Sequence, residues 1–230
     1  MGHPLDNAYV KLEHGRRRFT ELTAACDEIV VAEKQGMIVE RISRTLPDGQ
    51  VAEGLEVHRA RVPIPAHVSL LVGEVVNAFR AALEYLVRQL ALLDSGAADR
   101  TQFPIVDTPQ AFAKQRNDGL KGLTDDHVAA IEKLQPFAGC QWAVTLRRLS
   151  NWDKHNDLVV AMHNHGLGGV VHMGPADENG MAQWTAEVRI QPFVCIRDDK
   201  GGRVSLTDVA AMSSGIEAAL DQFRPDFPSS

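Results

Sequence analysis

Apolar residues recur at helical spacing along several stretches of this chain. Spacings of three, four and seven residues predict helices over residues 7–34 and 66–94. In the second of these the apolar and polar residues form separate stripes, which is typical of an amphipathic helix packed on a core. The same spacing predicts a helix from Cys140 to Met162 and a last helix over residues 207–223. Between the helices 66–94 and 140–162, Thr108 and Thr124 are expected to cap two short helices, so the region 66–162 forms a helical middle with loops after Ser95 and before Pro136.

Two other stretches alternate with a period of two, which indicates strands. Residues 37–62 are expected to form a hairpin, with its turn at Leu46-Pro47-Asp48-Gly49. Strands are also expected within residues 170–197, after Gly166, Gly168 and Gly169 end the preceding helix. The pattern predicts an α+β fold: a bundle of long amphipathic helices packed with one antiparallel β-sheet of about five strands. A single domain over residues 1–230 is the simplest organisation, and a helical bundle with a separate small sheet is the alternative.

Composition places the chain among globular proteins. Of 230 residues, 44% are hydrophobic and 23% charged, and the net charge is −6. This charge gives no general attraction to nucleic acid or to anionic membranes. Three widely spaced cysteines favour a reducing compartment, and every long apolar stretch is interrupted by charged residues. We therefore expect a cytoplasmic protein that does not span a membrane.

One polar run interrupts the apolar pattern of the predicted helix 140–162. It reads Asn151-Trp152-Asp153-Lys154-His155, and Asp153 falls on the same stripe as Leu146 and Leu149. A carboxylate that faces a core needs a cation or several hydrogen-bond donors, because an unpaired buried charge is costly. The run therefore marks a position where the chain departs from ordinary core packing.

Three motifs in a fixed order resemble an uncharacterised family of bacterial proteins. They are the segment 73–86, the tripeptide Phe103-Pro104-Ile105 and the run 151–155. Members of that family carry Gly-Asp-x-x-His-Asn-Leu-Arg-Ser-Ala-Leu-Asp-x-Leu, then Phe-Pro-Ile, then Asn-x-Asp-Lys-His-Arg. The resemblance implies no established activity. It implies a polar signature that this chain matches at Arg80, Glu84, Asn151, Asp153, Lys154 and His155.

The chain departs from that signature at three positions. Asn77 stands where the family has His, Ala78 where it has Asn, and Asn156 where it has Arg. If these positions served catalysis, this chain has lost it, whereas a packing role would tolerate the changes.

A structural role is the favoured interpretation of Asp153. We expect a polar pair in which Arg80 of the long helix holds Asp153 through charge-assisted hydrogen bonds, fixing the register of two packed helices. Asp153→Ala should then lower thermal stability sharply.

A second group of polar residues lies beside this pair. Arg148, Asn151 and His155 share the neighbouring helix face, and a histidine can serve as a general base. The arrangement is similar to that of HEPN-type ribonuclease domains, in which an Arg precedes a His by about two helical turns. That resemblance implies a metal-independent ribonuclease or toxin component that uses Arg148 and His155. The acidic net charge and the predicted sheet argue against it.

Metal and cofactor sites have little support in the sequence. His163 and His165 are weak candidates for a metal pair, since their spacing places both rings on one side of an extended chain. Phosphate-binding loops, dinucleotide fingerprints and paired CxxC motifs are absent, so no cofactor is expected. We conclude that a binding or interaction module without catalysis is the favoured function. A homodimer is an open alternative, and RNA is a partner only if the chain is a ribonuclease.

Overall fold

The computed structural model describes the backbone of most of the chain, in two compact units. One unit, which we call the helical unit, comprises Met1–Cys26, Pro65–Val160 and Ile196–Ser230, and the other, the ribbon unit, comprises Asp27–Ile64 and Ala161–Cys195. The described residues are 2–45, 47, 49, 51–59, 62–153, 159–176, 182–197 and 202–228. The fold is α+β and rich in helix, as the sequence predicts.

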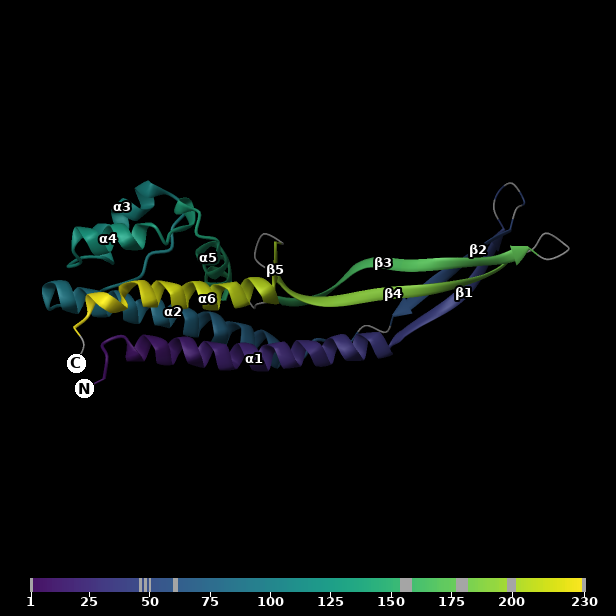
Figure 1. The fold of residues 1–230 in the computed structure, drawn as a ribbon, viewed down its shortest axis with the longest axis horizontal. Coiled ribbons are helices and arrows are strands. Elements are labelled where there is room, and N and C mark those ends of the chain that lie inside the picture. Colours follow the sequence, from purple (N-terminus) through teal and green to yellow (C-terminus); the bar gives the residue numbers. More distant parts are fainter. Residues whose placement is uncertain are drawn as a thin grey trace. The chain divides into compact units, whose positions relative to one another are not determined.

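The helix α2 (Ala66–Ser95) forms the centre of the helical unit. Its apolar stripe is almost completely buried, with Phe79, Leu83 and Leu86 each at 0% exposure. The helix ends where Gly96 adopts a left-handed conformation with φ of 73°, and the Gly96 N–H donates to Leu92 O. Helices α5 (Gln141–Asp153) and α6 (Leu206–Phe223) pack against α2, as Figure 1 shows.

The helix α1 (Asp6–Gln35) supplies its N-terminal part to the same unit. Gly15 lies directly against the ring of Phe79, where a Cβ would come within 2.5 Å of the ring. Polar bonds join α1 to α6: Arg16 donates to both carboxylate oxygens of Glu217, and the Tyr9 hydroxyl donates to Asp221. Burial and the Asp221 bond raise the pKa of Tyr9 to about 12.

Short helices and capped turns complete the helical unit. Thr108 and Thr124 cap the N-termini of α3 (Pro109–Asp118) and α4 (Asp125–Glu132), because their side chains accept hydrogen bonds from backbone N–H groups of the first turn. The remaining elements are η1 (Pro136–Ala138), β5 (Arg203–Ser205) and η2 (Arg224–Asp226). None of the helices in the described ranges combines the length and apolar composition that a membrane span requires.

The strands form two separate sheets in the part of the chain that the structure describes. β1 (Met37–Thr45) pairs antiparallel with β2 (Val51–Arg59), from Met37 opposite Arg59 to Thr45 opposite Val51. β3 (Val159–Ala176) and β4 (Ala182–Arg197) belong to a second sheet with the order β3-β4-β5. The prediction of one antiparallel sheet of about five strands is therefore wrong, because the N-terminal hairpin does not join the C-terminal strands.

The predicted helix boundary in the motif region is also wrong. α5 ends at Asp153, and β3 begins at Val159, so residues 159–162 are strand where the sequence pattern predicts helix. The three glycines at positions 166, 168 and 169 lie within β3 and do not form a linker. β-branched residues such as Val159 and Val160 favour an extended backbone, and pairing with β4 outweighs the cost of the glycines in a strand.

Candidate functional site

Two of the three sequence motifs meet at Phe103. The Phe103 N–H donates to Glu84 Oε2 at 2.8 Å, and Arg80 Nη2 donates to the Phe103 carbonyl at 2.5 Å. Arg80 Nε also donates to Glu84 Oε1 at 2.7 Å. The pair from α2 thus satisfies both backbone groups of a residue whose side chain is fully buried. We call Arg80, Glu84 and Phe103 the Phe103 clasp.

A second polar side chain holds the chain just after the clasp. The Val106 N–H donates to Gln135 Oε1 at 3.1 Å, and Gln135 Nε2 donates to Ile131 O at 3.1 Å. Gln135 is fully buried, so these bonds replace the water that its amide would otherwise require. The Phe-Pro-Ile segment is therefore fixed at both ends, and the role of Arg80 and Glu84 is at least partly structural.

The other predicted site residues are described only in part. Arg148 is a half-buried residue of α5 that takes part in a polar interaction. Asn151 and Asp153 belong to the last turn of α5, and only their backbone is described. Lys154 and His155 lie outside the described residues altogether. The Arg80–Asp153 pair and the group of Arg148, Asn151 and His155 therefore stay predictions.

Metal binding and thiol chemistry gain no support from the described residues. No group of three His, Cys, Asp or Glu side chains within the described ranges is arranged to hold a metal ion. His163 and His165 lie on β3, and their side chains are outside the description. Cys26 and Cys195 are buried, and burial raises the pKa of the Cys140 thiol, which disfavours the reactive thiolate.

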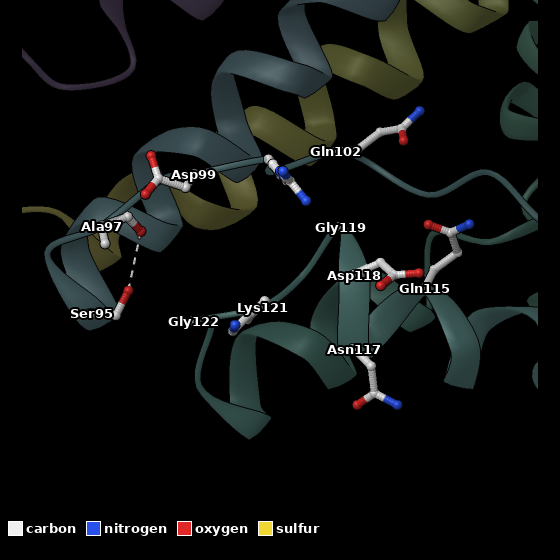
Figure 2. Close-up of a pocket in the computed structure, with 11 residues that line it drawn as sticks. Ser95, Ala97, Asp99, Gln102, Gln115, Asn117, Asp118, Gly119, Lys121 and Gly122 are labelled. Carbon is white, nitrogen blue, oxygen red and sulfur yellow. Dashed lines mark hydrogen bonds between the residues drawn. The ribbon is translucent and has the colours of Figure 1, made fainter.

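A polar groove lies where α2 ends and α3 turns toward α4. It has a volume of about 850 Å³ and is lined by residues of two segments, 95–102 and 115–122, each of which comprises the end of a helix and the loop after it (Figure 2). A smaller cavity of about 140 Å³ shares Gln102 and Gln115 with it and extends to Arg80, Phe103 and Ser150. The smaller cavity thus lies beside the Phe103 clasp and the C-terminal half of α5.

Close backbone contacts fix the two loops of the groove against each other. The Gln102 N–H donates to Gly119 O at 2.9 Å. A Cβ on Gly119 would lie 2.9 Å from Gln102 O, and a Cβ on Gly122 would lie 2.7 Å from Ser95 Oγ. Gly122 also has a φ of 93°, a conformation that few other residues adopt. The loops therefore approach as closely as they do because glycine occupies both positions.

One residue of the groove has an unusual backbone conformation. Arg100 has a φ of 57°, and it is the one non-glycine residue with a positive φ in the described ranges. A left-handed conformation costs an ordinary L-residue roughly 1–2 kcal/mol. Such positions cluster at binding and catalytic sites, where surrounding structure maintains them for a purpose.

The charged side chains of the groove balance. Asp99 and Asp118 contribute two negative charges, and Arg100 and Lys121 contribute two positive charges. Three further lining residues carry side-chain amides, which both donate and accept hydrogen bonds: Gln102, Gln115 and Asn117. Of the described residues that line the groove, only Ala97 and the two glycines lack a polar side chain.

Comparison with protein-family models, curated proteins and solved structures yields no match for this chain. Function must therefore be argued from the residues and their geometry. Sequence patterns do not predict the groove, because its residues come from the ends of α2 and α3 and from the loops after them, and periodicity does not show that these segments meet. The available signal is the turn chemistry of Gly96, Gly119 and Gly122 between helices, which marks loops but not a cavity.

Proposed function

We propose that this chain is a binding module whose helical unit holds a small polar ligand in the groove between α2 and α3. The observation that carries the proposal is a cavity of about 850 Å³ that is lined mainly by residues with polar side chains. Ligand pockets for small molecules have volumes of this order. Loops held by a rigid scaffold are also the usual place for binding residues.

The lining supports one class of ligand over others. Two acidic and two basic side chains give no net charge, so neither a polyanion nor a polycation is favoured. Three amides offer paired donors and acceptors. The groove therefore suits a neutral or zwitterionic molecule rich in hydroxyl, amide or amino groups.

Preorganisation supports the same proposal. The Gln102–Gly119 hydrogen bond and the two glycine contacts hold the groove open in its present form, so little ordering is required when a ligand binds. The left-handed backbone of Arg100 is energetically unfavourable, and contacts between its guanidinium and a ligand would offset that free energy. Arg100→Gly should therefore weaken binding while the free energy of unfolding stays the same or rises by up to about 1 kcal/mol.

The direct test is titration of isotope-labelled protein, followed by NMR, with three probes used separately: free amino acids, monosaccharides and nucleosides. We expect one class to shift the amide signals of Gly119 and Gly122. Lys121→Ala should then weaken binding of that class by about tenfold, since a charge-assisted bond contributes about 1.5 kcal/mol or more. Lys133→Ala is the matched control, because Lys133 is an exposed lysine at the end of α4, outside the groove. If no class shifts these signals, or if both variants weaken binding equally, the proposal is wrong.

A ribonuclease built on Arg148 and His155 makes an opposite prediction. Total RNA incubated with the purified protein and a metal chelator should stay intact if the chain is a binding module without catalysis. RNA cleavage that is lost in the His155→Ala variant would contradict the module and support the ribonuclease. The experiment needs no knowledge of the ligand.

A further inference from the structure

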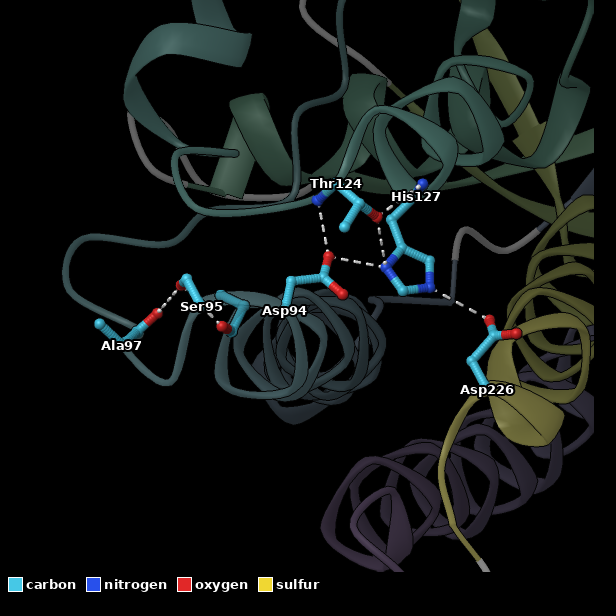
Figure 3. Close-up of polar contacts among 7 residues, drawn as sticks. Asp94, Ser95, Ala97, Thr124, His127 and Asp226 are labelled. Atoms are coloured by element: carbon cyan, nitrogen blue, oxygen red, sulfur yellow. Dashed lines mark hydrogen bonds and ion pairs between the residues drawn. The ribbon is translucent and has the colours of Figure 1, made fainter.

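His127 lies between two carboxylates that come from different elements (Figure 3). Its Nδ1 is 2.7 Å from Asp94 Oδ2 at the end of α2, and its Nε2 is 3.3 Å from Asp226 Oδ2 in η2. The Asp94 side chain is 6% exposed, that of His127 15% and that of Asp226 42%. An imidazole ring that is largely removed from water thus joins the groove end of α2 to the C-terminal turn.

The number of ring protons decides whether both contacts can form. A carboxylate only accepts hydrogen bonds, so each ring nitrogen must carry a proton to bond its partner. A neutral imidazole carries one such proton and an imidazolium carries two. When the ring is neutral and its proton faces Asp94, the Nε2 lone pair faces the Asp226 carboxylate and the contact is no longer attractive.

Other groups around the ring do not change this count. On its own element, Thr124 Oγ1 lies 3.2 Å from Nδ1, the nitrogen that also faces Asp94. From α6, the Phe223 ring packs against the imidazole at a centroid distance of 6.0 Å and carries no charge. Nearby charges have partners elsewhere: Asp125 pairs with Arg116, and Arg224 lies over the Tyr9 ring. The contacts described for the ring therefore include two charged groups, the carboxylates of Asp94 and Asp226.

The same histidine is connected to the groove through Asp94. Asp94 Oδ2 also accepts the Thr124 N–H at 2.7 Å, which ties the end of α2 to the start of α4. Ser95, the next residue after Asp94, lines the groove, and Gly122 lines it two residues before Thr124. Asp94 and Thr124 therefore lie within two residues of the segments that line the groove.

We propose that His127 is a proton-sensitive latch through which the C-terminal turn regulates the groove, an inference that rests on the proposed binding function. With the imidazolium present, Asp226 and Asp94 are both bonded and the turn is held against the ends of α2 and α4. As the pH rises and the ring loses a proton, the Asp226 contact is lost first, because the Asp94 contact is shorter and more buried. A metal ion does not explain the arrangement, since the two carboxylates face opposite ring nitrogens.

A double-mutant cycle of His127→Gln and Asp226→Asn tests the latch on the protein without ligand. Urea unfolding at about pH 5.5 should reveal a coupling of about threefold in the unfolding equilibrium constant, as expected for a partly exposed ion pair. The coupling should be smaller at about pH 8, where fewer imidazole rings carry the second proton that the contact with Asp226 requires. Asp126→Asn, an exposed neighbour on α4, is the matched control and should show no coupling to His127→Gln.

Effects on the groove are read from the amide signals of Gly119 and Gly122. These signals should shift between about pH 5.5 and about pH 8 in the wild type and in Asp126→Asn, and the shift should be reduced in Asp226→Asn. Asp226 is exposed enough for this variant to fold even if His127→Gln does not. The latch would be overturned if the coupling were equal at both pH values. It would also be overturned if the pH-dependent shift of the glycine signals were the same in Asp226→Asn as in the wild type. Because no ligand is present, a failure of the groove to bind its probes leaves this result unaffected.

Discussion

The Phe103 clasp and the His127 latch use the same chemistry at two places on α2. In each, a carboxylate of α2 accepts a backbone N–H from a later segment: Glu84 accepts from Phe103 at 2.8 Å, and Asp94 accepts from Thr124 at 2.7 Å. In each, a basic side chain also bonds that carboxylate. The two clusters differ in the basic partner, which is Arg80 in the clasp and His127 in the latch.

That difference separates a permanent connection from an adjustable one. A guanidinium keeps its charge over the whole physiological range of pH, whereas an imidazole gains or loses a proton within it. The clasp therefore fixes the Phe-Pro-Ile segment, and the latch can respond to conditions. The clasp lies beside fully buried Phe103, and the latch lies at the C-terminal end of α2.

Removal of the clasped side chain is expected to have the largest effect. Phe103→Ala should lower the free energy of unfolding by about 3–5 kcal/mol, because a fully buried aromatic ring leaves a cavity. Urea denaturation measures this loss, and Phe137→Ala is the control, since Phe137 is only half-buried in η1. Equal losses for the two variants would mean that the clasp does not hold a core residue.

Breaking the polar part of the clasp should cost less and should not depend on pH. Glu84→Ala leaves the Phe103 N–H and Arg80 without a charged partner, at a cost of about 2–3 kcal/mol. Glu84→Gln keeps an acceptor of the same length and should lose less. The losses should agree at about pH 5.5 and about pH 8, because the guanidinium stays charged. The control is Glu74→Ala, which removes an exposed ion pair between Glu74, on the same helix as Glu84, and Arg18 of α1. This variant should lose much less stability, and a loss comparable to that of Glu84→Ala would contradict the comparison.

Sequence reasoning found the clasp residues but not the latch. Arg80 and Glu84 are identified by their match to a motif, with Asp153 as the predicted partner of Arg80, whereas their bonds to Phe103 arise from tertiary packing. His127 carries no such signal, since Asp94 and Asp226 are 33 and 99 positions away in sequence. The helices were predictable from periodicity. The start of β3 is not predictable from periodicity. Gly166, Gly168 and Gly169 have the composition of a linker, and it is their pairing with β4 that makes them part of a strand.

The latch should show the pH dependence that the clasp lacks. Asp94→Asn keeps an oxygen that can accept the Thr124 N–H but removes the charge that faces His127. We expect a loss of about 1–2 kcal/mol in the free energy of unfolding at about pH 5.5 and a smaller loss at about pH 8. Urea denaturation at both pH values checks this. The comparison between the two clusters fails if Asp94→Asn and Glu84→Gln have the same pH dependence.

A third carboxylate tests whether the pH range is specific to the histidine. Glu217 of α6 accepts two bonds from Arg16 of α1, at 2.6 and 2.9 Å, and these bonds hold its pKa below the ordinary value of 4.5. A carboxylate with a lowered pKa stabilises the fold fully above its ordinary value and loses that contribution as the pH falls through the lowered one. Because the Glu217 side chain is 42% exposed, Glu217→Gln should cost only about 0.5 kcal/mol at neutral pH.

Acid titration of this variant completes the comparison. The difference between the wild type and Glu217→Gln, measured by urea denaturation, should be constant from about pH 8 to about pH 5.5 and should shrink only in more acidic solution. The stability difference for Asp94→Asn should change between about pH 5.5 and about pH 8, whereas that for Glu217→Gln should not. A Glu217→Gln difference that changes near neutral pH would show that the helical unit as a whole responds there, and the response could no longer be assigned to His127.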